Sequence, residues 1–350
     1  MTVRAGRIRA AASAATILAA LAAVPGAAPA ADGGTRFLER EAVREWVRDT
    51  AVERDLDRDR IANLFARLEP DPSVLELISR PAERTLSWRE YAPIFLTGER
   101  VDAGRAWIDE HRGALDAAAR EHGVPVPVIG AIVGVETFFG RIAGSRSVLR
   151  SLATLGFDHP PRADFFRAEL GEFLALAEGE GWDAGAVTGS YAGAMGLPQF
   201  IPSSYRAYAV DGDGDGRVDL FDSVPDVAAS VANYLARHGW RAGAVVAEPW
   251  PDAPASAAEL VRDSLTPAIE PAALRAAGFR SPALEAAETA GELVSVMRFA
   301  SRAGQGPGDD ATGSSFVVGY NNFHAITRYN RSRLYARAVH ELARALDDGP

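Results

Sequence analysis

The 350-residue chain contains no cysteine and no lysine, so all 37 of its basic residues are arginines. Without cysteine there is no disulfide, no thiol nucleophile, no Cys-based zinc site and no cysteine to carry a lipid. Without lysine there is no Schiff-base catalysis and no P-loop lysine to hold a phosphate. The six histidines show no metal-ligand spacing. The sequence therefore excludes aldolase-type enzymes and P-loop nucleotide hydrolases, and we expect neither a transition metal nor an organic cofactor.

Acidic residues outnumber basic residues in the chain. The chain has 37 basic and 47 acidic residues and a net charge of −10, which disfavours nucleic acid as a partner because the phosphate backbone selects basic surfaces. Hydrophobic residues make up 47% of the chain and charged residues 24%, as in ordinary globular proteins. At this length the chain can form one large or two modest cores.

The first thirty residues have the pattern of a secretory signal. Three arginines lie within the first nine residues, an apolar run continues to Leu21, and Ala28-Pro29-Ala30 offers small residues for cleavage after Ala30. A transmembrane anchor is the alternative, but the apolar stretch is short and breaks at Pro25-Gly26. We therefore predict a signal peptide over residues 1–30 and an exported protein, periplasmic or extracellular, without a transmembrane anchor. Removal of this signal peptide would leave 34 arginines and 47 acidic residues, a net charge of −13.

The remaining chain is predicted to be mainly α, an α+β fold with a small β element. Apolar residues recur at helical spacing in residues 163–178, 224–238 and 333–346. Strand composition is confined to residues 293–299 and 315–320. The predicted regions are an N-terminal helical region over 36–104, a mostly helical core over 105–250, a small β-containing region over 251–330, and a C-terminal helix over 331–346 that packs on the helical core.

One carboxylate, Glu136, lies in an almost wholly apolar helical stretch, residues 129–140 (IGAIVGVETFFG). Ile132 lies one turn before it and Phe139 nearly one turn after it, so Glu136 is on the buried face. Burial penalises the charged form and would raise the pKa of this carboxyl, and an acid that is protonated near neutral pH can protonate a glycosidic oxygen. A structural ion pair with one of the arginines is the alternative interpretation.

Small and turn-forming residues surround a few polar ones in residues 189–200 (GSYAGAMGLPQF). This composition suits a backbone that approaches a bulky polar ligand closely, with Ser190 and Gln199 as hydrogen-bonding groups. The alternative is a tight turn between helices whose glycines serve packing. No Gly-x-Ser-x-Gly elbow is present, so a serine nucleophile is not expected.

Residues 211–222 (DGDGDGRVDLFD) match the EF-hand calcium loop. Acidic residues occupy positions 1, 3, 5, 9 and 12, glycine is at position 6, and an apolar residue is at position 8. Asp222 stands at position 12, where Glu is usual. Five carboxylates in twelve residues would repel one another unless a cation joined them, so we predict a structural Ca²⁺ site. A solvated Asp/Gly turn is the alternative.

From about residue 36 to residue 346 the chain resembles the B-type lytic murein transglycosylases. The resemblance is carried by six ordered segments: VET-x-FG at 135–140, SLATL at 151–155, GAMGLPQF at 193–200 with PSS at 202–204, the calcium loop, SVANY at 230–234 with HGW at 238–240, and NF at 322–323 with ITRYN at 326–330. Chance agreement of all six in order is implausible.

The resemblance implies a lysozyme-like α catalytic domain over residues 105–250 that binds peptidoglycan glycan strands. It implies cleavage of the β-1,4 bond between N-acetylmuramic acid and N-acetylglucosamine without water. Glu136 would protonate the leaving oxygen and then, as a carboxylate, take the proton from the muramoyl 6-hydroxyl, which closes a 1,6-anhydro ring. One carboxylate then suffices, whereas hydrolytic glycosidases usually need two.

The resemblance also implies two sets of site residues. The glycan groove would be lined by Tyr91, Arg162, Ser190, Gln199, Tyr234, Tyr329 and Asn330. Calcium would be held by Asp211, Asp213, Asp215, the carbonyl of Arg217, and Asp222. This chain departs from the family at Pro161-Arg162, where two adjacent arginines are common, at His324, where an aromatic residue is common, and in having no cysteine for lipid attachment.

Two other functions fit parts of the same pattern. A hydrolytic muramidase would need a second carboxylate to activate water, for which Asp158, Asp164 or Glu169 is available in the sequence. A catalytically silent peptidoglycan-binding protein would keep Glu136 as a structural residue. The predicted function is the lytic transglycosylase.

Overall fold

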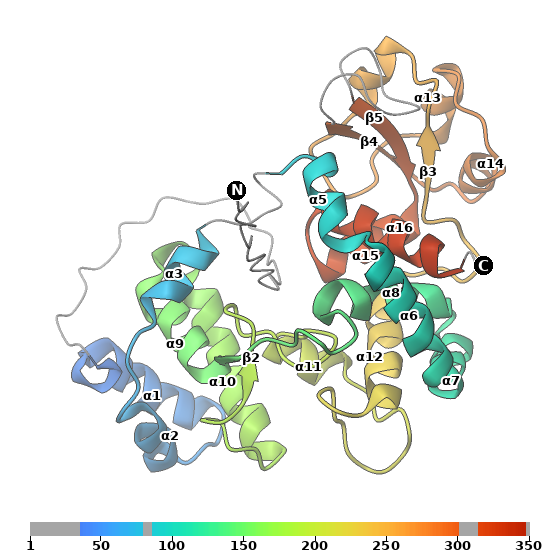
Figure 1. Cartoon of the computed structure of the whole chain (residues 1–350). Coiled ribbons are helices and arrows are strands. Elements are labelled where there is room, and N and C mark those ends of the chain that lie inside the picture. Colours follow the sequence, from blue (N-terminus) through green and yellow to red (C-terminus); the bar gives the residue numbers. More distant parts are fainter. Residues whose placement is uncertain (1–35, 80–85, 301–313, 348–350) are drawn as a thin grey trace, which may run out of the picture.

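The structure is a computed structural model that describes residues 36–79, 86–300 and 314–347 (Figure 1). The predicted signal peptide over residues 1–30 lies outside these ranges. Among the helices of the described ranges, none combines the length and the apolar character needed to cross a membrane.

Helices dominate the described chain, as predicted. They are α1 (Glu41–Glu53), α2 (Arg58–Phe65), α3 (Pro72–Ile78), α5 (Trp88–Phe95), α6 (Gly98–Glu110), α7 (Arg112–His122), α8 (Val126–Thr137), α9 (Val148–Asp158), α10 (Ala163–Gly179), α11 (Pro202–Tyr208), α12 (Val224–Arg237), α13 (Pro271–Ala276), α14 (Pro282–Thr289), α15 (Asn321–Tyr329) and α16 (Arg333–Asp347), with short 3-10 turns at Phe37–Glu39, Pro160–Arg162 and Ala255–Leu260. The helices predicted over 163–178, 224–238 and 333–346 correspond to α10, α12 and α16.

Local sequence explains where several helices begin. The carboxylate of Asp57 accepts hydrogen bonds from the backbone N–H groups of the first turn of α2, and the hydroxyls of Ser147 and Ser223 cap α9 and α12 in the same way. Proline stands in the first turn of α8, α11, α12, α13 and α14, where its missing N–H leaves no hydrogen bond unmade.

The strands form two small antiparallel sheets. One pairs β1 (Arg146–Ser147) with β2 (Thr188–Gly189), and the other has the order β3-β5-β4, with β3 at Ala247–Trp250, β4 at Ser295–Ala300 and β5 at Ser314–Gly319. The two predicted strands are therefore present as β4 and β5. The third strand, β3, was not predicted because it is short and contains Pro249, a residue that a sheet tolerates on an edge strand such as this one.

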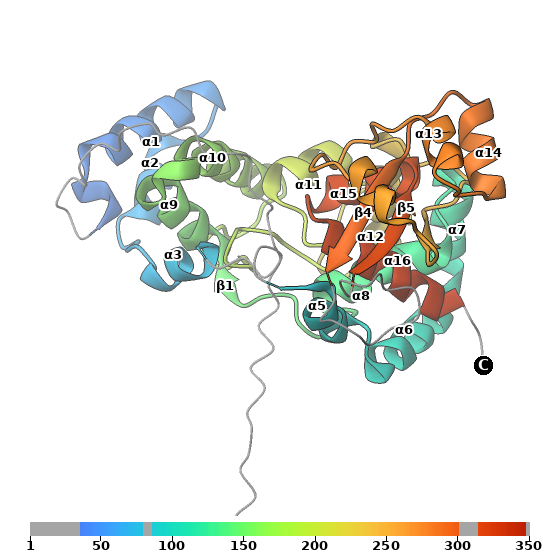
Figure 2. The same ribbon diagram turned by 90° about the horizontal axis from the view of Figure 1, so that it is seen from above.

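The described residues bury two hydrophobic clusters. The larger one joins the helices from α1 to α12 with α15 and α16, and the smaller one lies between the three-stranded sheet and helices α13 and α14. In both views of the ribbon, α1 and α2 lie at one end of the molecule and α13 and α14 at the other (Figures 1 and 2).

The segment 36–104 contributes to two separate parts of the helical body. Helix α3 packs against α9, and ion pairs join Arg40 to Asp158 at 2.6 Å and Arg54 to Glu172 at 3.0 Å. Helices α5 and α6 instead pack against α16 and α8 (Figure 1). The chain thus surrounds α8 with helices from its N-terminal and C-terminal regions, while the division at residue 104 stays an interpretation.

Helix α8 is apolar all round and buried all round. Of its twelve residues only Pro127 is not buried, as expected for a helix in the middle of a core. Two glycines allow its neighbours to approach: a Cβ at Gly130 would lie 3.0 Å from Ile108 on α6, and one at Gly134 would lie 3.1 Å from Leu342 on α16. The close packing of α8 against α16 positions the site described below.

Leu342→Ala should therefore destabilise the protein. The side chain is fully buried between α16 and α8, so its truncation removes transfer free energy and leaves a cavity, and we expect the free energy of unfolding to fall by about 2–5 kcal/mol. Val52→Ala, at a residue that is 81% exposed, is the matched control and should cost less than about 0.5 kcal/mol. Urea unfolding followed by circular dichroism measures both. Equal midpoints for the two variants would contradict the packing described here.

Candidate active site

The end of α8 differs from the expectation for residues 129–140. The helix ends at Thr137, and Phe138, Phe139 and Gly140 follow with positive φ angles of 52°, 56° and 85°. Phe139 therefore does not continue the helix. Its ring folds back onto α8, because a Cβ at Gly134 would lie only 2.6 Å from the ring atom Cζ. Glu136 is thus the penultimate residue of a helix that stops abruptly.

Glu136 is buried, with 7% of its surface exposed, and it accepts a hydrogen bond of 2.6 Å at Oε1 from the hydroxyl of Tyr335. Tyr335 lies on α16 and is itself 2% exposed. Burial, and then the negative charge of Glu136, raise the pKa of the Tyr335 phenol well above its ordinary value. The phenol therefore stays a neutral donor. Predicted burial of Glu136 is confirmed, and the partner is one that the sequence did not reveal.

Two predicted groove residues, Tyr234 and Tyr329, pack against each other, and Tyr329 also lies beside Tyr335. The rings of Tyr329 and Tyr335 are stacked, with centroids 6.4 Å apart and planes 13° apart, and the Tyr234 and Tyr329 centroids are 4.8 Å apart. Burial and the charge of Glu136 also raise the pKa of Tyr329 well above its ordinary value. Tyr329 donates its hydroxyl to the carbonyl of Pro198 at 2.6 Å. Tyr234, Tyr329 and Tyr335 form what we call the aromatic wall, and this hydrogen bond joins it to the 189–200 loop.

Ser190 and Gln199 in this loop are buried and hydrogen-bonded to backbone. The hydroxyl oxygen of Ser190 accepts from the N–H of Ala194 at 3.0 Å, and Nε2 of Gln199 donates to the carbonyl of Gly196 at 2.8 Å. Gln199 has a φ of 52°, and a Cβ at Gly196 would lie 2.3 Å from the Leu220 carbonyl oxygen. The glycines thus serve tight packing, and ligand contacts by Ser190 and Gln199 stay predictions.

Thr137 joins this loop to helix α8. Its hydroxyl donates to the carbonyl of Leu197 at 3.0 Å and accepts from the N–H of Gly140 at 3.1 Å. Thr137 is fully buried. The residue next to Glu136 therefore fixes both the loop and the turn that ends α8.

The other predicted groove residues differ in their relation to Glu136. Tyr91 on α5 is 1% exposed and lies close enough to Tyr335 to raise the pKa of that phenol. Asn330 follows Tyr329 directly, is 8% exposed, and its side-chain oxygen has no hydrogen-bond partner. Arg162 lies before α10, where its guanidinium is 4.2 Å from the Phe165 ring centroid, and burial lowers its pKa.

Each of the three candidate second carboxylates has a structural partner. Asp158 pairs with Arg40 at 2.6 Å, and Asp164, at the surface, pairs with Arg167. Glu169 is 4% exposed and accepts from the N–H and the hydroxyl of Ser203 at 2.9 and 2.7 Å. Burial raises the pKa of Glu169 although these hydrogen bonds oppose the rise. Glu169 thereby caps α11.

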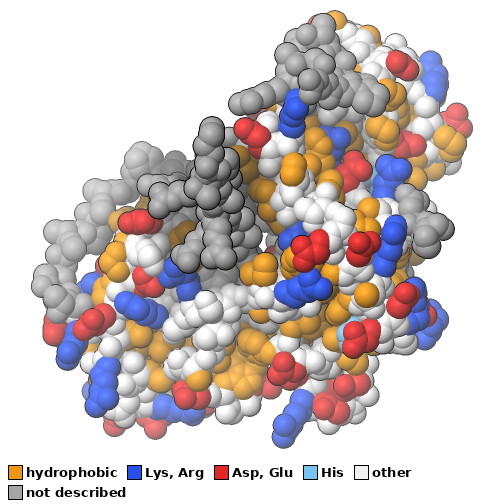
Figure 3. Space-filling view, in the orientation of Figure 1, with side chains coloured by type: hydrophobic (Ala, Val, Ile, Leu, Met, Phe, Trp, Pro, Cys, Tyr) orange, Lys and Arg blue, Asp and Glu red, His pale blue; other side chains and the backbone are white. Residues whose placement is uncertain are grey.

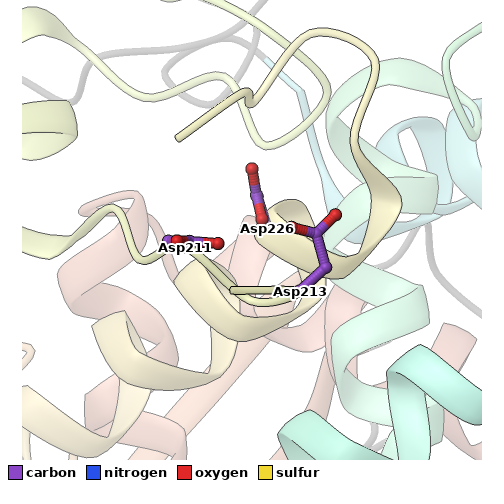
Figure 4. A group of neighbouring side chains, drawn as sticks. All are labelled: Asp211, Asp213 and Asp226. Atoms are coloured by element: carbon purple, nitrogen blue, oxygen red, sulfur yellow. The ribbon is translucent and has the colours of Figure 1, made fainter. Parts of the chain in front are cut away.

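Three carboxylates of the calcium loop region converge (Figure 4). Asp211, Asp213 and Asp226 each offer an oxygen atom, and these atoms lie within 4.8 Å of one another. Asp226 lies on α12, beyond the twelve-residue motif, so the sequence prediction did not include it. Its two oxygens accept from the N–H groups of Gly212 at 2.8 Å and Asp219 at 2.7 Å. A set of carboxylate oxygens suits a hard cation such as Ca²⁺.

The rest of the predicted calcium set is not part of this convergent group. Asp215 accepts from the N–H of Arg217 at 2.8 Å, and the N–H of Asp222 donates to Asp219 at 3.0 Å. Asp211 accepts N–H groups from Gly214 and Gly216, and the Gly216 hydrogen bond is the largest cause of its lowered pKa. Calcium ligation by Asp215, Arg217 and Asp222 stays a prediction.

The described surface carries both signs of charge. On the face shown in Figure 3, arginines and acidic side chains are interspersed and neither sign forms a continuous patch. Mixed charge of this kind offers no electrostatic footprint for a polyanion on that face.

Several known proteins are similar to this chain in sequence and in fold. The sequence model of the family described as Transglycosylase SLT domain matches residues 39–344. Membrane-bound lytic murein transglycosylase B of Escherichia coli (strain K12) is 35% identical over 327 residues, which are 89% of this chain and 84% of the relative.

Two solved structures are similar over most of their length. The soluble lytic transglycosylase SltB1 from Pseudomonas aeruginosa is 44% identical with a TM-score of 0.77, covering 87% of this chain and 98% of that one. Slt35 of Escherichia coli, solved in complex with calcium, is 34% identical with a TM-score of 0.77, covering 90% of this chain and 95% of that one. The chain therefore belongs to the transglycosylase SLT domain family, among the B-type lytic murein transglycosylases.

Proposed function

We propose that this protein is a lytic transglycosylase that cleaves the β-1,4 bond between N-acetylmuramic acid and N-acetylglucosamine in peptidoglycan and leaves 1,6-anhydro-muramoyl ends. The observation that carries the proposal is the setting of Glu136. It is a buried carboxyl at the end of α8 that accepts a hydrogen bond from Tyr335, beside an aromatic wall and a tightly folded polar loop.

Glu136 acts first as an acid and then as a base. Burial and the negative end of the α8 dipole both disfavour a charged carboxylate, so the acid form is available to protonate the leaving oxygen. The Tyr335 hydroxyl, 2.6 Å from Oε1, stabilises the carboxylate that this transfer creates. The carboxylate then removes the proton from the muramoyl 6-hydroxyl, and that oxygen closes the ring on the anomeric carbon.

The partners of the other carboxylates favour this reaction over hydrolysis. A muramidase requires a second carboxylate that is available to activate water or stabilise the sugar cation. Asp158 and Asp164 are engaged by arginines, and Glu169 caps α11. The hydrolytic function therefore lacks the group that it needs among these three candidates.

The glycan strand is expected to lie along the aromatic wall. Tyr234 and Tyr329 would pack on sugar rings, and Tyr91 would support Tyr335 from behind. The buried, unpaired side-chain oxygen of Asn330 favours a ligand N–H, such as that of an N-acetyl group, because a buried acceptor without a partner is costly. Ser190, Gln199 and Arg162 complete the proposed set, with Arg162 as the contact for a carboxylate.

Calcium is proposed as a structural ion. Asp211 and Asp213 would hold it with Asp226 or with the remaining loop ligands Asp215, the Arg217 carbonyl and Asp222. The ion neutralises the crowded carboxylates when it is bound and takes no part in the reaction. The signal-like residues 1–30 support export to the periplasm or the extracellular space, where peptidoglycan is accessible.

Mass spectrometry of purified peptidoglycan digested with residues 31–350 tests the function directly. Fragments that end in 1,6-anhydro-muramic acid are expected. Products heavier by one water would assign the protein as a muramidase, and the absence of products would favour the silent binding protein.

Glu136→Gln should abolish cleavage, with at least a thousandfold loss of rate, because one group performs both proton transfers. The variant keeps the shape of the side chain, so its melting temperature should stay within a few degrees of the parent. Glu110→Gln on the exposed side of α6 is the control and should cleave normally. A Glu136→Gln variant that still yields anhydro products would exclude this mechanism.

Tyr335→Phe should move the alkaline fall of activity to higher pH. The phenol donates to the Glu136 carboxylate, and removing a donor to the charged form makes the carboxyl harder to deprotonate. The acid form therefore persists to higher pH, while proton donation itself becomes slower because the carboxylate that it creates is less stabilised. Tyr205→Phe, which loses a buried hydroxyl bonded to the Val218 carbonyl, is the control. The measurement is kcat against pH, and coincident profiles for Tyr335→Phe and the parent would count against the assigned role of Tyr335.

Chelation should lower the melting temperature. A ligand that binds only the folded state stabilises it by about 2.7 kcal/mol at a hundred times its Kd, which corresponds to a shift of roughly 5 °C for a chain of this size. Asp211→Asn should lose most of the calcium-dependent shift, whereas Asp102→Asn, exposed on α6, should keep it. Differential scanning calorimetry with and without chelator provides the test, and identical curves for the parent would remove calcium from the description.

A further inference from the structure

The turn that follows Glu136 is held in an unfavourable backbone conformation. Phe138 and Phe139 both have φ angles in the left-handed region, 52° and 56°, which residues other than glycine rarely adopt. Glycine would meet the same geometry without strain, yet the chain has two aromatic residues here. Strained residues of this kind persist only where their surroundings hold them, and they concentrate at functional sites.

The Phe138 ring is held by two arginines. The guanidinium carbon of Arg100 lies 4.5 Å from the ring centroid and that of Arg141 lies 4.8 Å from it. Arg100 is 8% exposed, and it also donates through Nη1 to the carbonyl of Ile94 at 2.5 Å. A cation over an aromatic face attracts more strongly when it is removed from water. Arg100 therefore joins the turn to the end of α5.

The Phe139 ring occupies a space that two glycines leave open. A Cβ placed on Gly104 of α6, or on Gly134 of α8, would lie 2.6 Å from the ring atom Cζ. The Trp107 ring centroid lies 5.6 Å from that of Phe139. Phe139 is thus enclosed by α6, and it fits only because both positions lack a side chain.

Arg100, Gly104 and Trp107 are spaced four and three residues apart, so they share one face of α6. We propose that this face, which we call the α6 brace, positions the Glu136 carboxylate by holding the turn at residues 138–140, with Arg100 and Phe138 as positioning residues. If the turn relaxed and the helix continued, the Gly140 N–H would leave the Thr137 hydroxyl, 3.1 Å away. The end of α8, and with it the direction of the Glu136 side chain, would then change.

A purely structural role for Arg100 is disfavoured by its own burial. Its Nε is buried without a hydrogen-bond partner, and burial lowers the pKa of the guanidinium. A buried charge is costly unless all of its polar groups are paired. An arginine whose Nε has no partner is therefore a costly choice for packing alone. Positioning of the acid accounts for an arginine at this place.

The test is Arg100→Met, and it rests on the proposed lytic transglycosylase activity. We expect kcat to fall about tenfold, because small displacements of a catalytic group are costly in rate, while KM changes less than about twofold and the melting temperature stays within roughly 2 °C. Arg100→Lys keeps a cation and should recover part of the rate. Arg112→Met, on an exposed residue of α7 with 53% of its side chain accessible, is the matched control and should behave like the parent.

Phe138→Leu provides a second, independent variant, since it keeps an apolar side chain and removes the ring. It should lower kcat by a similar factor, and the double variant with Arg100→Met should lose little more, because both changes remove one interaction. An unchanged kcat in Arg100→Met would overturn the brace. So would a fall in kcat that is matched in both variants by a fall in melting temperature, because the rate would then be lost through unfolding. If the parent itself gives no anhydro-muramoyl products, the proposed function fails and the brace fails with it. A cleaving parent with equally active variants refutes the brace alone.

Discussion

The packing of α16 against α8 is the contact on which the site depends. It carries Tyr335 to Glu136 across 199 positions of sequence and sets their hydrogen bond at 2.6 Å. The approach is possible because α8 has glycine at 130 and 134, where the side chains of Ile108, Phe139 and Leu342 fill the space. An apolar helix surrounded on all sides is a strong scaffold for a single acid, since few alternative packings exist in a close-packed core.

Local patterns predicted the helices well, because caps, prolines and apolar spacing are written in neighbouring residues. They also marked Glu136 as buried and residues 211–222 as a cation loop. Two of the misses depend on contacts distant in sequence. Tyr335 reads as one more core residue on the face of α16 with Val339 and Leu342, and nothing near it in the sequence points to Glu136. Asp226 lies four residues beyond the calcium motif, and only the fold brings it to Asp211.

The end of α8 was wrong for a different reason. Phe138 and Phe139 continue the apolar pattern of residues 129–140, so periodicity extends the helix through them. The structure stops the helix because the hydroxyl of Thr137, the two glycines beside Phe139 and the cation beside Phe138 together outweigh the cost of two left-handed aromatic residues. Among the described residues, only four that are not glycine have positive φ angles. Phe138 and Phe139 are two of them, and Gln199, in the loop that is hydrogen-bonded to Thr137, is a third. Local rules fail where the site requires an unusual backbone.

The loop at residues 211–222 and Glu136 are connected through the same part of the fold. The carbonyl of Leu220, inside the loop, accepts from the N–H of Leu197 at 2.8 Å, and the carbonyl of Leu197 accepts from the Thr137 hydroxyl at 3.0 Å. Asp226 accepts hydrogen bonds from both halves of the loop, and Tyr234, also on α12, packs against the ring of Tyr329. The Tyr329 hydroxyl in turn donates to the carbonyl of Pro198. Two routes through named hydrogen bonds and rings therefore connect the loop to the segment against which Glu136 is placed. A loop whose carboxylates repel would strain both routes, which gives a physical reason why the proposed structural ion would stabilise the surroundings of Glu136.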